Sequence, residues 1–337
     1  MKITGTTKLY GLFVTPVEHS MSPAMYNYCF EKWNLDCRYL AFDVPRERTE
    51  DAVKAFRTLG MKGANVTMPC KQAVIPYLDW VSPAVTLSGA CNTIVNDNGT
   101  LKGYITDGEG YVMNLQTHGM DIQGKNITLL GAGGAATAIQ VQALLDGASA
   151  IWVFNKKDAF WDFAQKKIRE LQEAFPNQEI RLYDLEDSRL LKAKIQDSDV
   201  LTNATRVGMA PLENSSLIQD MSLFRESLLV TDCVYNPRKT RLLKDAEKNG
   251  SLLLPRAAFV SLPRAARLRV YAGLFHRFGR GQAQSETLFR LDGAAVSSRS
   301  RKVFQFPGGV CITTDGDGVL MKTGGVEKPP APLLSSP

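Results

Sequence analysis

The stretch Asn126-Ile-Thr-Leu-Leu-Gly131-Ala-Gly133-Gly134-Ala-Ala136 decides the fold of this 337-residue chain. An apolar strand leads into G-x-G-x-x-A, a helix pattern continues to Leu145, and a second apolar strand follows at 151–155. A strand, glycine turn, helix and strand within about 30 residues are typical of dinucleotide-binding proteins, where close glycines let backbone N–H groups approach a pyrophosphate. The alternative is a glycine turn that only packs a strand against a helix. The residues expected to bind NAD or NADP are Gly131, Ala132, Gly133, Gly134 and Ala135.

The end of the second strand is where such proteins distinguish NAD from NADP. An acidic residue there accepts a hydrogen bond from the ribose 2′-hydroxyl of NAD, whereas basic residues bind the 2′-phosphate of NADP. The run Asn155, Lys156, Lys157 and Asp158 offers both kinds of group. In the alternative, the lysines are solvated and Asp158 caps the next helix. We therefore expect NAD and/or NADP as cofactor, and no metal.

The first 105 residues alternate between short strand and helix patterns. Strand patterns cover 9–14, 37–44 and 63–68, and Asn98-Gly99 predicts a hairpin turn. Ser22 is expected to cap a helix that starts at Pro23. Strands that alternate with helices predict an α/β fold with substantial parallel pairing.

Composition and charge exclude several classes of protein. The chain is 44% apolar and 22% charged, as in globular proteins, and it lacks a run of about 18 apolar residues that could span a membrane. Its six cysteines have no metal-ligand spacing, which favours a reducing, cytoplasmic location. Residues 251–337 carry 12 basic and 5 acidic side chains, and the rest carries 28 and 29. This neutral body argues against a nucleic-acid partner.

Several further motifs occur in a fixed order around the glycine turn. They are His19–Pro23, Asn65–Lys71, Asn92-Thr93, Thr106–Gly108, Asn203–Met209 and Val234–Pro237. On these motifs, residues 8–250 resemble the shikimate dehydrogenase family, and most of all its quinate/shikimate dehydrogenase branch. The resemblance implies an N-terminal α/β substrate domain (1–105), a Rossmann-type NAD(P)-binding domain (106–250) and an atypical basic tail (251–337).

The resemblance also implies an activity. It is NAD(P)-dependent interconversion of shikimate and 3-dehydroshikimate, and/or of quinate and 3-dehydroquinate, in aromatic amino acid biosynthesis or quinate use. Reduction of a ketone leaves an alkoxide that needs a proton, which a lysine can supply. By its match to the family, Lys71 is the expected proton donor and acceptor, and Asp107 is its partner.

The remaining site residues are carried over in the same way. Ser20 and Ser22 are expected to bind the substrate carboxylate, and Thr67 and Asn92 its ring hydroxyls, with Tyr39 as a further candidate. The residues expected to border the cofactor are Arg206, Cys233, Val234, Tyr235 and Asn236. The expected partner is a small-molecule substrate. Whether the chain forms a homodimer is left open.

The resemblance stops after Gly250. In the family, a helix follows whose glutamine reaches the substrate. The sequence after Gly250 predicts no such helix, because Pro255 and Pro263 interrupt the helix patterns. The change of composition suggests a shifted reading frame or a fusion, and residues 329–337 are expected to be disordered. The alternative function is therefore a catalytically impaired homologue that still binds NAD(P) or a metabolite.

Overall fold

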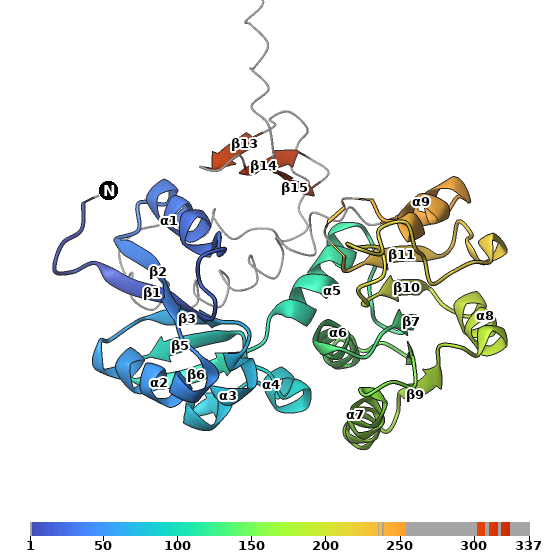
Figure 1. Cartoon of the computed structure of the whole chain (residues 1–337), viewed down its shortest axis with the longest axis horizontal. Helices are drawn as coiled ribbons and strands as arrows, with labels where there is room; N and C mark the ends of the chain where they lie inside the picture. Colours follow the sequence, from blue (N-terminus) through green and yellow to red (C-terminus); the bar gives the residue numbers. More distant parts are fainter. Residues whose placement is uncertain are drawn as a thin grey trace, which may run out of the picture.

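The described part of the chain forms three sheets. The computed structural model describes residues 2–234, 236–237 and 239–253, and the backbone of 302–306, 310–315 and 318–323. Within these residues two sheets have six strands and one has three. Figure 1 shows the two large sheets side by side, with helices on their faces. The predicted α/β class, with a Rossmann-type second half, is confirmed.

The first large sheet is mixed, with the strand order β2-β1-β3-β5-β6-β4. Its strands are β1 (Lys8–Val14), β2 (Cys37–Asp43), β3 (Gly63–Val66), β4 (Trp80–Val81), β5 (Thr93–Asp97) and β6 (Thr100–Tyr104). Its helices are α1 (Ser22–Lys32), α2 (Thr49–Thr58), α3 (Cys70–Ala73) and α4 (Pro83–Ser88). Successive side chains of a strand face opposite sides. Leu12 therefore packs in the cluster with α1, and Phe13 in the cluster with α2.

Two local predictions in this half have different outcomes. The hairpin is confirmed, because β5 and β6 are antiparallel and Asn98 and Gly99 have the positive φ angles, 54° and 96°, of a tight hairpin turn. The prediction that Ser22 caps a helix is wrong, because Ser22 is the first helical residue and Met21 occupies the capping position. The hydroxyl of Ser20 instead accepts a hydrogen bond from the Ser22 amide at 3.3 Å.

The second large sheet is fully parallel, with the order β12-β11-β10-β7-β8-β9. Its strands are β7 (Asn126–Leu130), β8 (Ala150–Asn155), β9 (Glu179–Asp184), β10 (Val200–Asn203), β11 (Leu229–Asp232) and β12 (Leu252–Leu253). Its helices are α5 (Asp107–Thr117), α6 (Gly134–Leu145), α7 (Trp161–Ala174), α8 (Ser188–Gln196) and α9 (Arg241–Lys248). Short 3-10 helices span Arg46–Arg48, Ile75–Tyr77 and Met221–Leu223. The strand order reverses between β7 and β10, which is where Rossmann folds bind dinucleotides.

Helices α5 and α6 join the two halves. An added Cβ at Gly108 of α5 would lie 2.2 Å from the carbonyl oxygen of Ala138 in α6. Lys167 of α7 also donates a hydrogen bond to the Leu87 carbonyl, near the end of α4, at 2.8 Å. One buried apolar cluster includes residues of both large sheets and of α5 and α6. The two halves are therefore packed together without a spacer.

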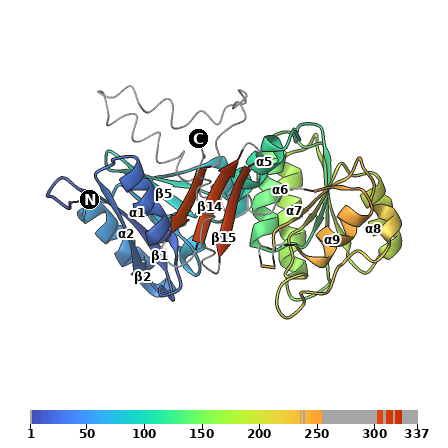
Figure 2. The ribbon, with the colours of Figure 1, turned by 90° about the horizontal axis from the view of Figure 1, so that it is seen from above.

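The predicted domain boundaries can be located on this fold. The boundary between 105 and 106 falls between β6 and α5, but the shared apolar cluster leaves the division into separate domains a prediction. The second sheet extends to Leu253, three residues into the predicted tail. Further along, β13 (Lys302–Phe306), β14 (Val310–Asp315) and β15 (Gly318–Thr323) form an antiparallel sheet, seen from above in Figure 2. The expected disorder of 329–337 lies outside the described residues.

The close contact of α5 with α6 predicts the effect of a single methyl group. Gly108→Ala should lower the free energy of unfolding by about 1–3 kcal/mol, because the backbone of Ala138 must move to admit the new Cβ. Urea-induced unfolding measures the change. Gly134→Ala is the matched control in α6, since no atom lies within 4 Å of its added Cβ. Equal midpoints for the two variants would contradict the close packing.

Candidate active site

A lysine and an aspartate form an ion pair between the two halves. Lys71 lies in α3, Asp107 is the first residue of α5, and Lys71 Nζ lies 2.8 Å from Asp107 Oδ2. The side chains are 27% and 23% exposed, so the pair is sheltered but open to water. The N-terminus of α5 favours a negative charge on Asp107. The pair can thus hold an ammonium group in a fixed place and supply its proton.

The loops that carry the predicted substrate residues meet at one edge of the first sheet. β1 and β3 are parallel neighbours, so the loops after them leave from the same edge. The first loop carries Ser20 and leads into Ser22 of α1, and the second carries Thr67. The Thr15 amide donates to the Met68 carbonyl at 3.5 Å and joins these loops. β5 is antiparallel to β3, and β6 to β5, so Asn92 before β5 and Asp107 after β6 reach that edge too.

Asn92 is fully buried and its amide is held in one orientation. Its Oδ1 accepts from the Thr93 hydroxyl at 2.8 Å, and from the amide and hydroxyl of Thr106 at 3.2 and 3.3 Å. Three donors at one atom identify it as the oxygen. The Nδ2 atom then has no hydrogen-bond partner among the described residues. A buried donor without a partner costs about 1–3 kcal/mol, so a ligand oxygen at this point would be stabilising.

Tyr39 and Ser20 differ from Asn92 in their surroundings. Tyr39 is fully buried, stacks on Tyr26 and donates its hydroxyl to Asn65 Oδ1 at 2.7 Å. It therefore supports Asn65, a buried residue whose role the sequence did not indicate. Ser20 and Thr67 in the loops described above are half-buried, and so is Ser22, the first residue of α1. Hydroxyls beside the first turn of α1 could donate hydrogen bonds to an anion.

The glycine turn opens the second half of the site. Gly131 has φ of +102°, and an added Cβ would lie 2.9 Å from the methyl group of Thr205, so only glycine fits there. Gly133 and Gly134 are exposed, and no atom lies within 4 Å of a Cβ added at either. This free space and the N-terminus of α6 together fit the pyrophosphate of a dinucleotide. Ala132 is buried behind the turn, whereas Ala135 is exposed beside it.

The two lysines after β8 differ in their ion pairing. Lys157 Nζ lies 3.1 Å from Asp184 Oδ2, and the Glu186 amide together with this ammonium lowers the pKa of Asp184. The ammonium of Lys156 is exposed and has no ion-pair partner in the part of the chain that the structure describes. Lys156 is thus the cation better placed for a phosphate. Asn155 is half-buried at the strand end and donates to the Lys156 carbonyl at 2.8 Å.

Asp158 does not cap the next helix. Its Oδ1 accepts from the Phe160 amide at 2.9 Å, whereas α7 begins at Trp161 with Phe160 in the capping position. The carboxylate instead closes the turn 158–160, which directly precedes the helix. The alternative interpretation of Asp158 as a helix cap is therefore wrong.

A buried carboxylate fixes the loops after β10 and β11. Asp232 Oδ1 accepts from Asn203 Nδ2 at 3.0 Å and from the Val234 amide at 2.8 Å, and Oδ2 accepts from the Thr240 hydroxyl at 2.5 Å. Asn203 Nδ2 also donates to the Val207 carbonyl at 3.0 Å. Sequence motifs indicated both loops, but the link between them becomes visible only when β10 and β11 pair.

The predicted cofactor residues of these loops have different environments. Arg206 and Asn236 are exposed, Cys233 is half-buried and Val234 is buried. Burial raises the pKa of the Cys233 thiol well above its usual value, so the group stays neutral. Tyr235 lies outside the described residues. The two exposed side chains are thus those that a ligand can reach without rearrangement.

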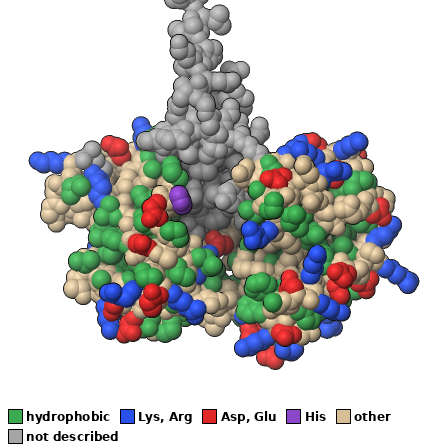
Figure 3. Space-filling view, in the orientation of Figure 1, with side chains coloured by type: hydrophobic (Ala, Val, Ile, Leu, Met, Phe, Trp, Pro, Cys, Tyr) green, Lys and Arg blue, Asp and Glu red, His purple; other side chains and the backbone are tan. Residues whose placement is uncertain are grey.

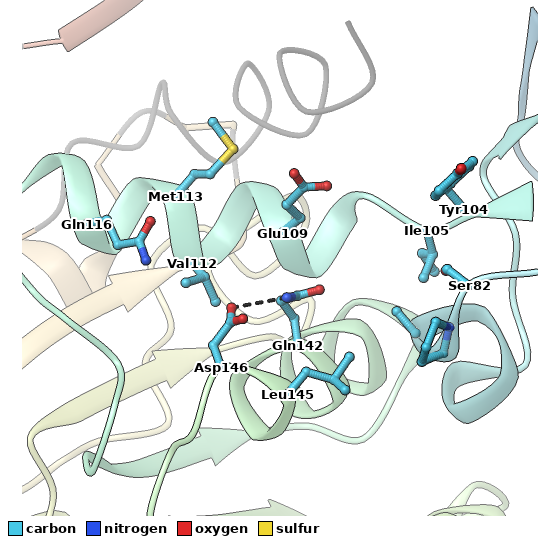
Figure 4. A pocket seen from close by; sticks show the side chains of 12 residues that line it. Ser82, Tyr104, Ile105, Glu109, Val112, Met113, Gln116, Gln142, Leu145 and Asp146 are labelled. Carbon is cyan, nitrogen blue, oxygen red and sulfur yellow. Dashed lines mark hydrogen bonds between the residues drawn. The ribbon is translucent and has the colours of Figure 1, made fainter. Parts of the chain in front are cut away.

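A cavity of about 420 Å³ lies between α4, α5 and α6, with Glu109, Gln142 and Asp146 among its lining residues (Figure 4). Neither Lys71 nor Asp107 lines it, so it is distinct from the ion pair. The molecular surface is also hollowed between the two halves (Figure 3).

Across the described ranges, no group of three His, Cys, Asp or Glu side chains could hold a metal ion. No helix there is long and apolar enough to cross a membrane.

A parallel sheet with a glycine turn at its switch point, beside a lysine–aspartate pair, defines an NAD(P)-dependent oxidoreductase. The family model of the shikimate dehydrogenase substrate binding domain matches residues 12–94. The shikimate dehydrogenase (NADP(+)) of Listeria innocua is 48% identical over 249 residues, which are 74% of this chain and 85% of that protein. That of Streptococcus uberis is 47% identical over 252 residues, with the same coverage. The chain belongs to the shikimate dehydrogenase family.

Solved structures agree with this assignment. Shikimate 5-dehydrogenase from Listeria monocytogenes, in complex with shikimate and NAD, matches with a TM-score of 0.78 and 44% identity over 81% of this chain and 94% of that one. Quinate dehydrogenase from Corynebacterium glutamicum, in complex with NAD, has a TM-score of 0.69 and 26% identity over 79% and 94%. The predicted enzyme class and NAD(P) cofactor are confirmed. The impaired homologue is not favoured, while location and oligomeric state stay predictions.

The open space at the glycine turn predicts a selective loss of cofactor binding. Gly133→Ala should raise the Kd for NADP about tenfold, or 1.4 kcal/mol, because the methyl group enters the space for the pyrophosphate. Stability should not change, since no protein atom lies within 4 Å of the new Cβ. Calorimetric titration measures Kd, and Gly5→Ala, equally open but outside the turn, is the control. An unaltered Kd would exclude Gly133 from the cofactor site.

Proposed function

We propose that this chain reduces 3-dehydroshikimate to shikimate with NADPH, and catalyses the reverse reaction with NADP. The observation that carries this is the ion pair of Lys71 and Asp107, 2.8 Å long, at the end of α5 that packs against α6. Because α6 begins at the glycine turn, the same helix pair brings a proton donor and a cofactor site together. Its relatives named shikimate dehydrogenase (NADP(+)) support the choice of substrate.

The proposed chemistry assigns one proton to one atom. When bound, the nicotinamide supplies a hydride to the carbonyl carbon of the substrate. The ammonium of Lys71 gives a proton from Nζ to the carbonyl oxygen, so no free alkoxide accumulates. Asp107 holds Nζ in place through the 2.8 Å contact. With 27% of its side chain exposed, Lys71 can then regain a proton from water.

The proposed recognition of the substrate uses the edge of the first sheet. Asn92 Nδ2, which has no hydrogen-bond partner among the described residues, would donate to a ring hydroxyl, and Thr67 on the loop after β3 would contact another. Ser20 and Ser22, at the start of α1, would bind the carboxylate. Tyr39 would act through Asn65, to which it donates at 2.7 Å. Residues 1–105 would thus bind the substrate, and residues 106–250 the cofactor.

Quinate with NAD is a second candidate. The structure of a quinate dehydrogenase in complex with NAD matches this chain over 79% of its length. Quinate offers the same carboxylate and ring hydroxyls that these residues would contact. A spectrophotometric assay of reduced nicotinamide, with shikimate or quinate and NADP or NAD in all four pairings, ranks the two reactions.

Removal of the proposed proton donor tests the mechanism. Lys71→Ala should lower kcat at least about a hundredfold, the usual contribution of general acid–base catalysis, and leave the Kd for NADP unchanged. Lys102→Ala is a matched control, since Lys102 also belongs to a partly buried ion pair of the first sheet, 2.6 Å from Asp97. Its kcat should stay within twofold.

Two results would contradict the proposed function. One is full activity of Lys71→Ala, which would exclude Lys71 as the proton donor. The other is silence of the wild-type protein in all four pairings while circular dichroism shows that it is folded. The second result would favour the impaired binding homologue.

The unequal lysines after β8 predict cofactor preference. Lys156→Ala should raise KM for NADP about tenfold and leave KM for NAD unchanged, because its ammonium is free to meet the 2′-phosphate. Lys157→Ala should have a smaller effect, since its charge is already shared with Asp184. Steady-state kinetics with both cofactors measures the split. Equal losses with NAD and NADP would exclude Lys156 from recognition of the phosphate.

A further inference from the structure

Helix α5 is tied to the second sheet by a buried hydroxyl pair. The Tyr111 hydroxyl lies 2.7 Å from Thr202 Oγ1 on β10, although 91 residues separate them in sequence. Tyr111 is 1% and Thr202 0% exposed. The bond therefore forms where water does not compete for either hydroxyl, and α5 gains one directional contact with the sheet.

The hydroxyl pair continues to the next strand. Thr202 and Thr231 are register partners on β10 and β11, and the Thr231 hydroxyl donates to Thr202 Oγ1 at 3.0 Å. The next register pair is Asn203 and Asp232, whose link fixes the loops bordering the predicted cofactor site. Tyr111 is thus attached at the carboxyl ends of the strands, the end at which parallel sheets bind dinucleotides.

Two contacts define how α5 lies. Gly108 sets its distance from α6, because no Cβ fits between its backbone and Ala138. Tyr111 fixes its rotation against β10. Asp107 is one helical turn from Tyr111, and residues four apart lie on the same side of a helix. A rotation of α5 at Tyr111 would therefore move Asp107 and change its contact with Lys71.

The link keeps the same form over a wide pH range. Burial raises the pKa of the Tyr111 hydroxyl far above its usual value, so the phenol remains protonated. Thr202 and Thr231 do not titrate. The contact is a neutral hydrogen bond, and its role is geometric.

We propose that Tyr111 is a positioning residue for hydride transfer: through Thr202 and Thr231 it fixes α5 on the cofactor-binding sheet and holds the Asp107 carboxylate on Lys71. The inference rests on the proposed function of Lys71 and Asp107. It adds that the carboxylate is placed by the sheet that binds the cofactor, and not only by the helix that carries it.

Tyr111→Phe removes the hydroxyl and keeps the ring. Its kcat should fall about tenfold, because small displacements of a catalytic group reduce the rate without abolishing binding. KM for both substrates should stay within twofold. With NADPH deuterated at the transferred position, the isotope effect on kcat should equal or exceed that of the wild type, because a slower chemical step becomes more rate-limiting.

A double-mutant cycle isolates the hydrogen bond. Thr202→Val keeps the shape of the side chain and should reduce kcat to a similar extent. The double variant should be no slower than the slower single variant, because both changes break the bond between Tyr111 and Thr202. Losses that multiply in the double variant would overturn the proposal.

A second buried hydroxyl pair in the same sheet supplies the control. Thr128 Oγ1 and Ser198 Oγ are also 2.7 Å apart and buried, but this pair links β7 with the segment before β10, whereas the pair of Tyr111 and Thr202 links α5 with β10. Thr128→Val should lower the unfolding midpoint about as much as Thr202→Val and leave kcat within twofold. An equal loss of kcat in both would reduce the role of Tyr111 to stability and overturn the proposal.

Asp107→Asn separates this inference from the proposed function. If Asp107→Asn loses activity while Tyr111→Phe keeps kcat within twofold, the positioning role is wrong and the proposed function stands. If both Lys71→Ala and Asp107→Asn keep full activity, the proposed function fails, and the positioning role fails with it.

Discussion

The close approach of α5 to α6 at Gly108 is the contact on which the rest of the site depends. The carbonyl oxygen of Ala138 occupies the space of a Cβ, so the two helix backbones touch where they cross. Asp107 directly precedes this contact in α5, and the glycine turn opens α6. One packing constraint therefore sets the distance between the proton-donating pair and the cofactor turn. A side chain at position 108 would push α5 away from α6 and so move the ion pair away from the cofactor turn.

Polar groups lie at the strand ends in both halves, but their hydrogen bonding differs between the two halves. In the first sheet the edge carries loops whose amide and hydroxyl groups are half-buried or buried, and Asn92 keeps one donor that has no partner among the described residues. In the second sheet the buried polar atoms of Asn203, Asp232 and Thr240 bond one another. Within the described residues, the first edge therefore keeps a buried donor for a ligand, whereas the loops of the second edge are hydrogen-bonded to one another. This difference suits recognition on one side and cofactor placement on the other.

Sequence reasoning succeeded where the signal was local. The glycine turn and the Asn98-Gly99 hairpin depend on backbone conformations that few residue types adopt, so both could be predicted from neighbouring residues. The predicted cap of α1 is one residue too late, because the helix already begins at Ser22 and Met21 occupies the capping position. The hydrogen bond between Tyr111 and Thr202 joins residues 91 apart in sequence, so the local pattern of apolar residues does not predict it. Tyr39 was indicated by resemblance, but its burial behind Asn65 required the structure.

The departure from the family pattern after Gly250 affects this site less than it affects the length of the resemblance. Residues between 20 and 240 form all the parts of the site described above: the ion pair, Asn92, the glycine turn and the paired loops. A glutamine from a later helix, as the family pattern implies, would add a hydrogen bond to the substrate. One such bond contributes about 0.5–1.5 kcal/mol, a factor of roughly 2–13 in affinity. The proton transfer proposed for Lys71 does not pass through it. A different C-terminal segment should therefore change how tightly substrate binds more than whether the reaction occurs.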